Sequence, residues 1–177
     1  YVYAREIDIT NKSAQIFVET QVKNELPAEK NVELEVKIED PDGKIIKTFK
    51  SKPEKIASGE MKSIKAHNKV SDLHFWSWGY GYLYNVYTTL IVDGKPSDVV
   101  KTRTGFRKTR FDKGMFWLND RVLQIKGYAE RTTNEWPAQG QSVPAWLSDY
   151  SNKMMVESNA NTVRWMHVTP WKQDVES

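Results

Sequence analysis

The sequence predicts a mainly β fold, with an antiparallel β-sandwich over residues 1–107 and a strand–helix–strand segment over 108–177. Three observations predict it. Residues 1–107 consist of short runs rich in Val, Ile, Thr, Tyr and Phe, and apolar residues recur in them with period two. Turn residues separate these runs at short intervals. After Arg107 a helical period appears, and five of the seven Trp residues lie there.

Seven strands are expected in the first part. In residues 32–38 apolar side chains alternate strictly with charged ones, which is typical of a strand with one face on a core and one in water. The charges of this run are therefore interpreted as a solvated face. The expected strands span about 2–10, 14–23, 31–40, 44–51, 59–69, 82–92 and 97–107.

Turn chemistry supports antiparallel neighbours. Residues 40–43 read Asp-Pro-Asp-Gly, in which Pro sets φ at the second position and Gly accepts a positive φ. Residues 91–95, with Asp-Gly at their centre, predict the last hairpin in the same way. The connection around 70–81 is longer and dense in aromatic residues. These connections therefore predict a sandwich with one long aromatic loop.

The second part predicts the start of a parallel α/β structure. Residues 116–127 read as a hairpin around Asn119-Asp120 that leads into a strand, and residues 162–166 read as a second strand. Between them, Pro144 begins a helix. Strand, helix and strand in succession favour parallel pairing. The expected apolar stripe of the helix consists of Trp146, Leu147, Tyr150, Met154 and Met155.

Composition excludes several classes of function. The 177 residues include no Cys, which excludes thiolate catalysis, Cys-ligated zinc and iron–sulfur clusters. The net charge of +3 comes from 26 basic and 23 acidic residues of interleaved sign, so no nucleic-acid partner is expected. No apolar run approaches the roughly 20 residues that span a bilayer, so no membrane partner is expected. We favour a periplasmic or secreted location, which the lack of Cys does not decide.

The sequence indicates neither a cofactor nor a metal. His67 and His74 have no third ligand at a suitable spacing, and no phosphate-binding Gly loop, Gly-x-Ser-x-Gly or His-Glu-x-x-His motif occurs.

Several motifs in a fixed order carry a resemblance to glycoside hydrolase family 2, which includes β-galactosidases, β-glucuronidases and β-mannosidases. The chain resembles this family over nearly its whole length, and most of all its β-galactosidases. The motifs are Trp76 with Leu83-Tyr84, Gly-Phe-Arg at 105–107, the segments 116–121 and 125–127, and 159–164 followed by His167 and Pro170.

The resemblance implies the domain organisation. Residues 1–107 would form the family's immunoglobulin-like β-sandwich, and 108–177 the N-terminal portion of a truncated (β/α)8 catalytic domain. A complete barrel takes about 250 residues. The family's two catalytic Glu residues lie on later barrel strands, so we expect a fragment of a retaining glycosidase that hydrolyses nothing alone. Its implied partners are a carbohydrate substrate and the rest of its own barrel, and a homo-oligomer is left open.

The resemblance also implies substrate-binding positions in the parent enzyme. No catalytic residue is expected in the chain itself, and Glu130 with Glu135 is not interpreted as the catalytic pair. Arg164 matches an Arg beside the nucleophile, where a fixed cation keeps a carboxylate ionised. At Arg131 this chain departs from the usual His, which leaves the substrate open. The expected substrate-binding residues are Arg131, Asn134, Trp136, Arg164, Trp165 and His167.

Two other interpretations stay open. The chain could be a self-contained module that binds a glycan or a protein through its aromatic loops, or a catalytically inactive homologue. Stacking of Trp136, Trp165 or Trp171 on a sugar is expected for one of the three, because large aromatic residues more often lie in cores. The aromatic run that includes Trp76 and Trp78 is interpreted as core or interface rather than as a binding platform.

Overall fold

The computed structural model describes residues 1–130, 144–166 and 169–176. The chain divides into two compact units. The first, here called the sandwich unit, comprises Tyr1–Phe111 and Trp117–Arg121, and the second, the C-terminal unit, comprises Asp112–Phe116 and Val122–Ser177. Each unit is described by itself below.

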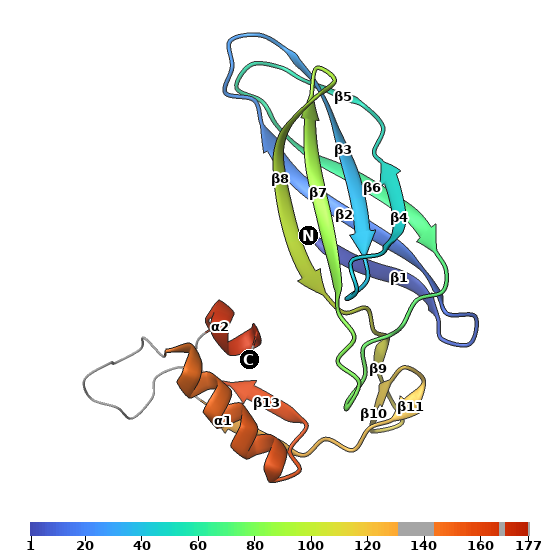
Figure 1. Cartoon of the computed structure of the whole chain (residues 1–177), viewed down its shortest axis with the longest axis vertical. Coiled ribbons are helices and arrows are strands. Elements are labelled where there is room, and N and C mark those ends of the chain that lie inside the picture. The colour runs from blue at the N-terminus through green and yellow to red at the C-terminus, as the bar shows by residue number, and fades with distance from the viewer. Residues whose placement is uncertain (131–143, 167–168, 177) are drawn as a thin grey trace. The chain divides into compact units, whose positions relative to one another are not determined.

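One sheet of the sandwich unit, sheet A, has three strands. They are β1 (Val2–Asp8), β2 (Ser13–Lys23) and β6 (Met61–Val70), in the order β1-β2-β6. Both strand pairs are antiparallel. Strands β1 and β6 are therefore the two edges of sheet A (Figure 1).

The other sheet, sheet B, has the order β4-β3-β7-β8, and the short β5 also pairs with β3. Every pairing in it is antiparallel. Strand β8 is an edge and is exposed along most of its length. The strands of sheet B are β3 (Lys30–Glu39), β4 (Ile45–Lys50), β5 (Glu54–Ile56), β7 (Tyr84–Val92) and β8 (Lys95–Thr104).

The core lies between the inward faces of sheets A and B. In β3 the apolar residues are buried and the charged residues between them are more exposed, as the alternation predicts. All seven predicted strands of residues 1–107 are present, whereas β5 was not predicted. The main core cluster contains Ala14, Ile16, Val18, Val36, Ile38, Phe49, Ala66, Val70, Leu73, Tyr84, Val86 and Phe106, and a second contains Val32, Leu34, Ile56 and Ile64.

A small sheet follows the sandwich strands. Its order is β11-β10-β9, with β9 at Thr109–Asp112, β10 at Met115–Leu118 and β11 at Arg121–Val122. The turn between β10 and β11 is Asn119-Asp120, and both residues have positive φ, at 49° and 63°. This backbone belongs to the primed hairpin turns, which favour Asn and Asp. The hairpin prediction is confirmed, and β9 is an addition to it.

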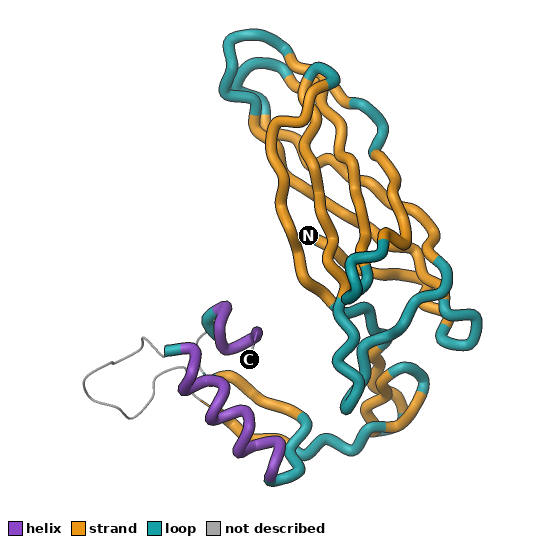
Figure 2. The backbone as a smooth tube through the Cα atoms, in the orientation of Figure 1, coloured by secondary structure: helices purple, strands orange, loops and turns teal. Residues whose placement is uncertain are grey.

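In the C-terminal unit, β12 (Gly127–Glu130) and β13 (Thr162–Trp165) pair in parallel. Helix α1 (Ala145–Glu157) lies between them in sequence, with Pro144 at its N-cap. The predicted strand–helix–strand order and its parallel pairing are confirmed. A short helix, α2 (Lys172–Glu176), was not predicted. Figure 2 shows that the described helices occur only in this part of the chain, and neither has the length and apolar character needed to cross a membrane.

The apolar stripe predicted for α1 is mostly exposed in the structure. Trp146, Tyr150 and Met154 are exposed, and Leu147 and Met155 are only partly buried. The buried residue of the helix is Ser148. The periodicity correctly identified a helix, but a spacing of three and four residues does not tell which side a neighbour covers.

Candidate functional site

Two of the predicted substrate-binding residues, Arg164 and Trp165, lie at the carboxyl end of β13, which pairs in parallel with β12. In the register of β12 and β13, Ala129 lies opposite Arg164 and Glu130 lies opposite Trp165. Parallel α/β folds place their ligand sites at this edge. Arg164 is exposed and Trp165 is partly buried. Because neighbouring side chains of a strand point to opposite faces, Arg164 and Trp165 do not share a face.

The other four predicted site residues cannot be compared with the structure. Arg131, Asn134, Trp136 and His167 lie outside the described residues, as does Glu135. Their assignment therefore stays a prediction.

Asn161 connects the start of β13 to the segment that leads into β12. Its main-chain N–H donates to the Lys126 carbonyl over 2.8 Å, and its side-chain Oδ1 accepts from the Lys126 N–H over 2.9 Å. Its Nδ2 donates to the Gln124 carbonyl over 2.9 Å. At Gly127 an added Cβ would lie 3.0 Å from the Thr162 carbonyl oxygen. The motifs 125–127 and 159–164 thus meet in space and hold the two strands in register.

A buried polar contact joins α1 to α2. The Ser148 hydroxyl donates to the Asp174 carboxylate over 2.5 Å, and both residues are buried. The other carboxylate oxygen of Asp174 accepts from the Trp171 N–H over 2.8 Å. This contact holds together the chain on either side of β13. No motif in the sequence singled out Ser148 or Asp174.

The aromatic loop before β7 is tied to the end of β8 through Trp76. The main-chain N–H of Trp76 donates to the Phe106 carbonyl over 2.9 Å. Beside it, a Cβ placed on Gly105 would lie 2.7 Å from the Cβ of Trp76, so only Gly leaves room for the indole. The Arg107 guanidinium stands 5.3 Å from the centre of the Trp76 ring. Trp76 and the Gly-Phe-Arg motif therefore form one packed structure.

The side chain of Asn119 attaches the β10–β11 turn to the segments that contain Trp76 and Lys108. Its Nδ2 donates to the Trp76 carbonyl over 2.9 Å, and its Oδ1 accepts from the Lys108 N–H over 3.0 Å. The Asn119 N–H in turn donates to the Lys108 carbonyl over 2.8 Å. The hairpin was predicted, but these partners, far away in sequence, were not.

Aromatic rings continue from the core to the surface along the same loop. Buried Tyr84 packs against Phe106, and its hydroxyl accepts from the His74 N–H over 2.7 Å. Burial raises the pKa of Tyr84 to about 12. His74 stacks on Tyr82 at 4.6 Å between ring centres. The inner end of the loop is core, as expected, whereas Trp78 and Tyr80 are exposed at 43% and 47%.

His67 of sheet A and His74 of the aromatic loop both contact aromatic side chains. His67 stacks on Phe17 on the face of sheet A, and the Tyr80 hydroxyl lies 2.9 Å from His74 Nδ1. Among the residues that the structure describes, no group of three or more His, Asp or Glu side chains could hold a metal ion.

Comparison with known proteins connects these features to a family. The family model described as glycosyl hydrolases family 2 matches residues 2–107, the part that contains β1 to β8. The chain belongs to glycosyl hydrolase family 2. The resemblance found in the sequence motifs is thereby confirmed.

Two curated relatives of this family 2 chain are similar over almost all of it. A β-glucuronidase of Formosa agariphila is 32% identical in a match 177 positions long, which covers 99% of this chain and 18% of that protein. A β-glucuronidase of Streptococcus agalactiae is 24% identical over 168 residues, 95% of this chain and 24% of that protein. The chain thus spans less than a quarter of the length of these relatives.

Solved structures agree with the family 2 assignment. A β-glucuronidase from glycoside hydrolase family 2 superimposes with a TM-score of 0.87 at 32% identity, over 99% of this chain and 18% of that one. Bacteroides uniformis β-glucuronidase 2, covalently bound to cyclophellitol-6-carboxylate aziridine, gives 0.83 at 25% identity, over 99% and 21%. The sandwich described here is accordingly a β-sandwich domain of family 2 enzymes.

Proposed function

We propose that this chain is part of a retaining glycoside hydrolase that cleaves O-glycosidic bonds. In this proposal residues 1–107 are the immunoglobulin-like domain and 108–177 are the N-terminal portion of a (β/α)8 catalytic domain. The observation that carries it is the parallel pair β12 and β13, which follows a family 2 sandwich and the small sheet β9–β11 in the chain. A right-handed strand–helix–strand unit is the repeating element of such a barrel.

The catalytic carboxylates are proposed to lie outside this chain. Retaining glycosidases need two carboxyl groups about 5 Å apart, one as acid and one as nucleophile. The chain contributes binding groups instead. Arg164, exposed on β13, is proposed to keep the nucleophile ionised, because a fixed cation lowers the pKa of a neighbouring carboxyl group. The remaining proposed contacts to the sugar are Arg131, Asn134, Trp136, Trp165 and His167.

The sugar specificity of the longer enzyme is tested by comparing two substrates, a β-galactoside and a β-glucuronide. The motifs resemble those of β-galactosidases most, whereas both curated relatives above are named β-glucuronidases. A glucuronide carries a carboxylate that a galactoside lacks. Comparing the 4-nitrophenyl β-glycosides of both sugars therefore measures whether the enzyme recognises that charge.

The test uses the longer enzyme with the 177-residue chain as its control. We expect the longer enzyme to release 4-nitrophenol from one of the two glycosides and the chain alone to release none. Replacing Arg164 with Ala in the longer enzyme should lower kcat/KM by about 100-fold, as loss of a charged contact to a reacting group does. Arg121→Ala, which removes an exposed Arg of β11, should leave it unchanged. Turnover by the 177-residue chain itself would refute the proposal.

A second candidate function is binding of a glycan by the chain itself. The exposure of Trp78 and Tyr80 favours it, because an indole face can stack on a sugar ring. It predicts saturable binding of oligosaccharides by the isolated chain, detected by titration calorimetry, that Trp78→Ala abolishes.

A further inference from the structure

Asn161 uses both polar atoms of its side-chain amide to attach β13 to the segment before β12. Its Oδ1 accepts from the Lys126 N–H over 2.9 Å and from the Thr162 hydroxyl over 3.1 Å. Its Nδ2 donates to the Gln124 carbonyl over 2.9 Å, and its main-chain N–H donates to the Lys126 carbonyl over 2.8 Å. These partners fix the orientation of the amide, because only its oxygen accepts and only its nitrogen donates.

The ladder between β12 and β13 does not specify its own register. The two strands pair over four residues, from Gly127 opposite Thr162 to Glu130 opposite Trp165. Main-chain N–H and C=O groups are the same at every non-proline residue, so a strand displaced along its partner would form a similar ladder. The register therefore depends on side chains.

Two features distinguish the observed register from a displaced one. At Gly127 an added Cβ would lie 3.0 Å from the Thr162 carbonyl oxygen, and every neighbour of Gly127 in this segment carries a Cβ. This close approach disfavours displaced registers. The Asn161 amide favours the observed one, because its side-chain hydrogen bonds to Gln124 and Lys126 form only when β13 begins at this height. Of the two features, only Asn161 adds hydrogen bonds.

The register decides where Arg164 lies at the carboxyl edge of the pair. In the structure it lies opposite Ala129. A strand rises about 3.3 Å per residue in a parallel sheet, so a displacement by two residues would move Arg164 by about 7 Å along β12. A displacement by one residue would place it on the other face relative to β12. Either change would remove its guanidinium from the observed position.

We propose that Asn161 is a positioning residue, which fixes the register of β12 and β13 and thereby places Arg164 opposite Ala129. The inference rests on the proposed function for the part that Arg164 plays in the reaction, whereas the position of Arg164 is a property of the strand pair. Asn161 contacts neither the sugar nor the reacting atoms in this assignment. It acts through Arg164.

Engineered disulfides measure the register without enzymatic activity. The 177-residue chain has no Cys, so an introduced pair meets no competing thiol. Tyr128→Cys with Val163→Cys joins positions that are opposite in the observed register. Neighbouring strands lie about 4.8 Å apart, which is within reach of a disulfide. Tyr128→Cys with Trp165→Cys joins positions that become opposite only when β13 is displaced by two residues. Mass spectrometry after oxidation gives the yield of each disulfide.

Asn161→Ala should lower the yield of the first disulfide relative to the second by about tenfold or more, because the hydrogen bonds that specify the register are lost. Asn159→Gly is the matched control. Asn159 is exposed with a φ of 61°, which Gly adopts without strain, so its replacement should leave the ratio unchanged. A ratio in Asn161→Ala equal to that of the control would overturn the proposal.

Loss of the fold is detected separately. Circular dichroism reports whether helix α1 persists in each variant. If Asn161→Ala loses the helical signal, Asn161→Asp replaces it under the same criterion. This variant keeps an acceptor oxygen for the Lys126 N–H and removes only the donor to Gln124.

Kinetics of the longer enzyme show whether the register acts through Arg164. Asn161→Ala should lower kcat by about 10- to 100-fold with little change in KM, as misplacement of a group that acts in the transition state does. Asn159→Gly should change neither. In the Arg164→Ala background, Asn161→Ala should cost no further activity, because the side chain that it displaces is already absent. Losses that multiply would overturn the action through Arg164.

Failure of this inference differs from failure of the proposed function. A longer enzyme that releases 4-nitrophenol from neither glycoside would contradict the proposed function. The ratio of the two disulfides would still decide whether Asn161 fixes the position of Arg164.

Discussion

Asn119 donates a 2.9 Å hydrogen bond to the carbonyl oxygen of Trp76, which lies 43 residues earlier in the chain. The same side chain accepts from the Lys108 N–H. One amide therefore holds the aromatic loop, the end of the sandwich strands and the β10–β11 turn together. This arrangement explains in physical terms why Trp76, Gly-Phe-Arg and Asn119 occur together as motifs.

Asn119→Gly should destabilise the chain by about 2 kcal/mol, because it removes two hydrogen bonds to main-chain groups. Gly adopts the positive φ of this position without strain, so the loss measures the hydrogen bonds. Asp120→Gly is the matched control in the same turn, since it removes only an exposed ion pair with Lys108 and should change stability by less than about 1 kcal/mol. Urea unfolding followed by Trp fluorescence measures both. Equal midpoints for the two variants would contradict the role of Asn119.

Gly105→Ala should destabilise the chain by about 1–3 kcal/mol, because the new methyl group would lie 2.7 Å from the Cβ of Trp76 and force it to move. Gly81→Ala offers a matched control, since its methyl group would approach Trp76 only to 3.9 Å. Thermal unfolding distinguishes the two variants. A Gly105→Ala chain as stable as the Gly81→Ala chain would show that the indole can shift without cost.

The buried hydroxyl of Tyr84 predicts a loss of stability at high pH. Burial raises its pKa in the folded chain to about 12, against a value near 10 when unfolded. Above pH 10 the unfolded chain binds fewer protons than the folded one, so the stabilising contribution is complete below pH 10 and is lost as the pH rises toward 12. Two pKa units correspond to about 2–3 kcal/mol.

Tyr84→Phe tests this contribution. The variant loses the acceptor for the His74 N–H at every pH, but its unfolding free energy should fall less steeply between pH 10 and 12 than that of the parent chain. Urea titrations at pH 8, 10 and 11.5 measure the difference. Parallel pH profiles for both proteins would exclude Tyr84 as the source.

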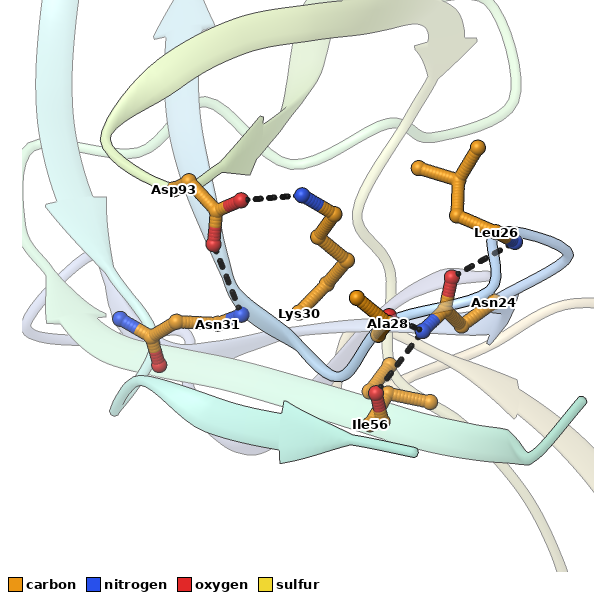
Figure 3. A network of polar contacts seen from close by, with 7 residues as sticks. All are labelled: Asn24, Leu26, Ala28, Lys30, Asn31, Ile56 and Asp93. Atoms are coloured by element: carbon orange, nitrogen blue, oxygen red, sulfur yellow. Dashed lines mark hydrogen bonds and ion pairs between the residues drawn. The ribbon is translucent and has the colours of Figure 1, made fainter. Parts of the chain in front are cut away.

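Asn24→Ala should cost about 2–4 kcal/mol, because the buried Ile56 carbonyl and the part-buried Ala28 carbonyl and Leu26 N–H all lose their hydrogen-bond partner (Figure 3). Asn31→Ala is the control, since the bonds that join Asn31 to Asp93 come from its main chain. It should change stability by no more than about 0.5 kcal/mol. Denaturant unfolding of both variants checks the prediction, which fails if the two lose equal stability.

Much of the fold could be predicted from local patterns. Period two in residues such as Val32 to Ile38 places alternate side chains on one face of a strand wherever that strand lies. Three residues are too few to show a period, and for that reason β5 was missed. The period of α1 is likewise local, but the side that a neighbour covers is not, so the period did not decide whether Trp146 and Tyr150 are buried, and in the structure both are exposed.

The sequence by itself determined the seven main strands of residues 1–107, the hairpin turns and the family, because alternation, turn residues and ordered motifs are properties of neighbouring positions. Only the tertiary structure decided which distant groups meet. The bonds of Asn119 to Trp76, Asn161 to Gln124 and Ser148 to Asp174 join positions far apart in the chain. A polar side chain has the same local appearance whether it faces water or a buried carbonyl, and the folded backbone alone brings its partner within reach.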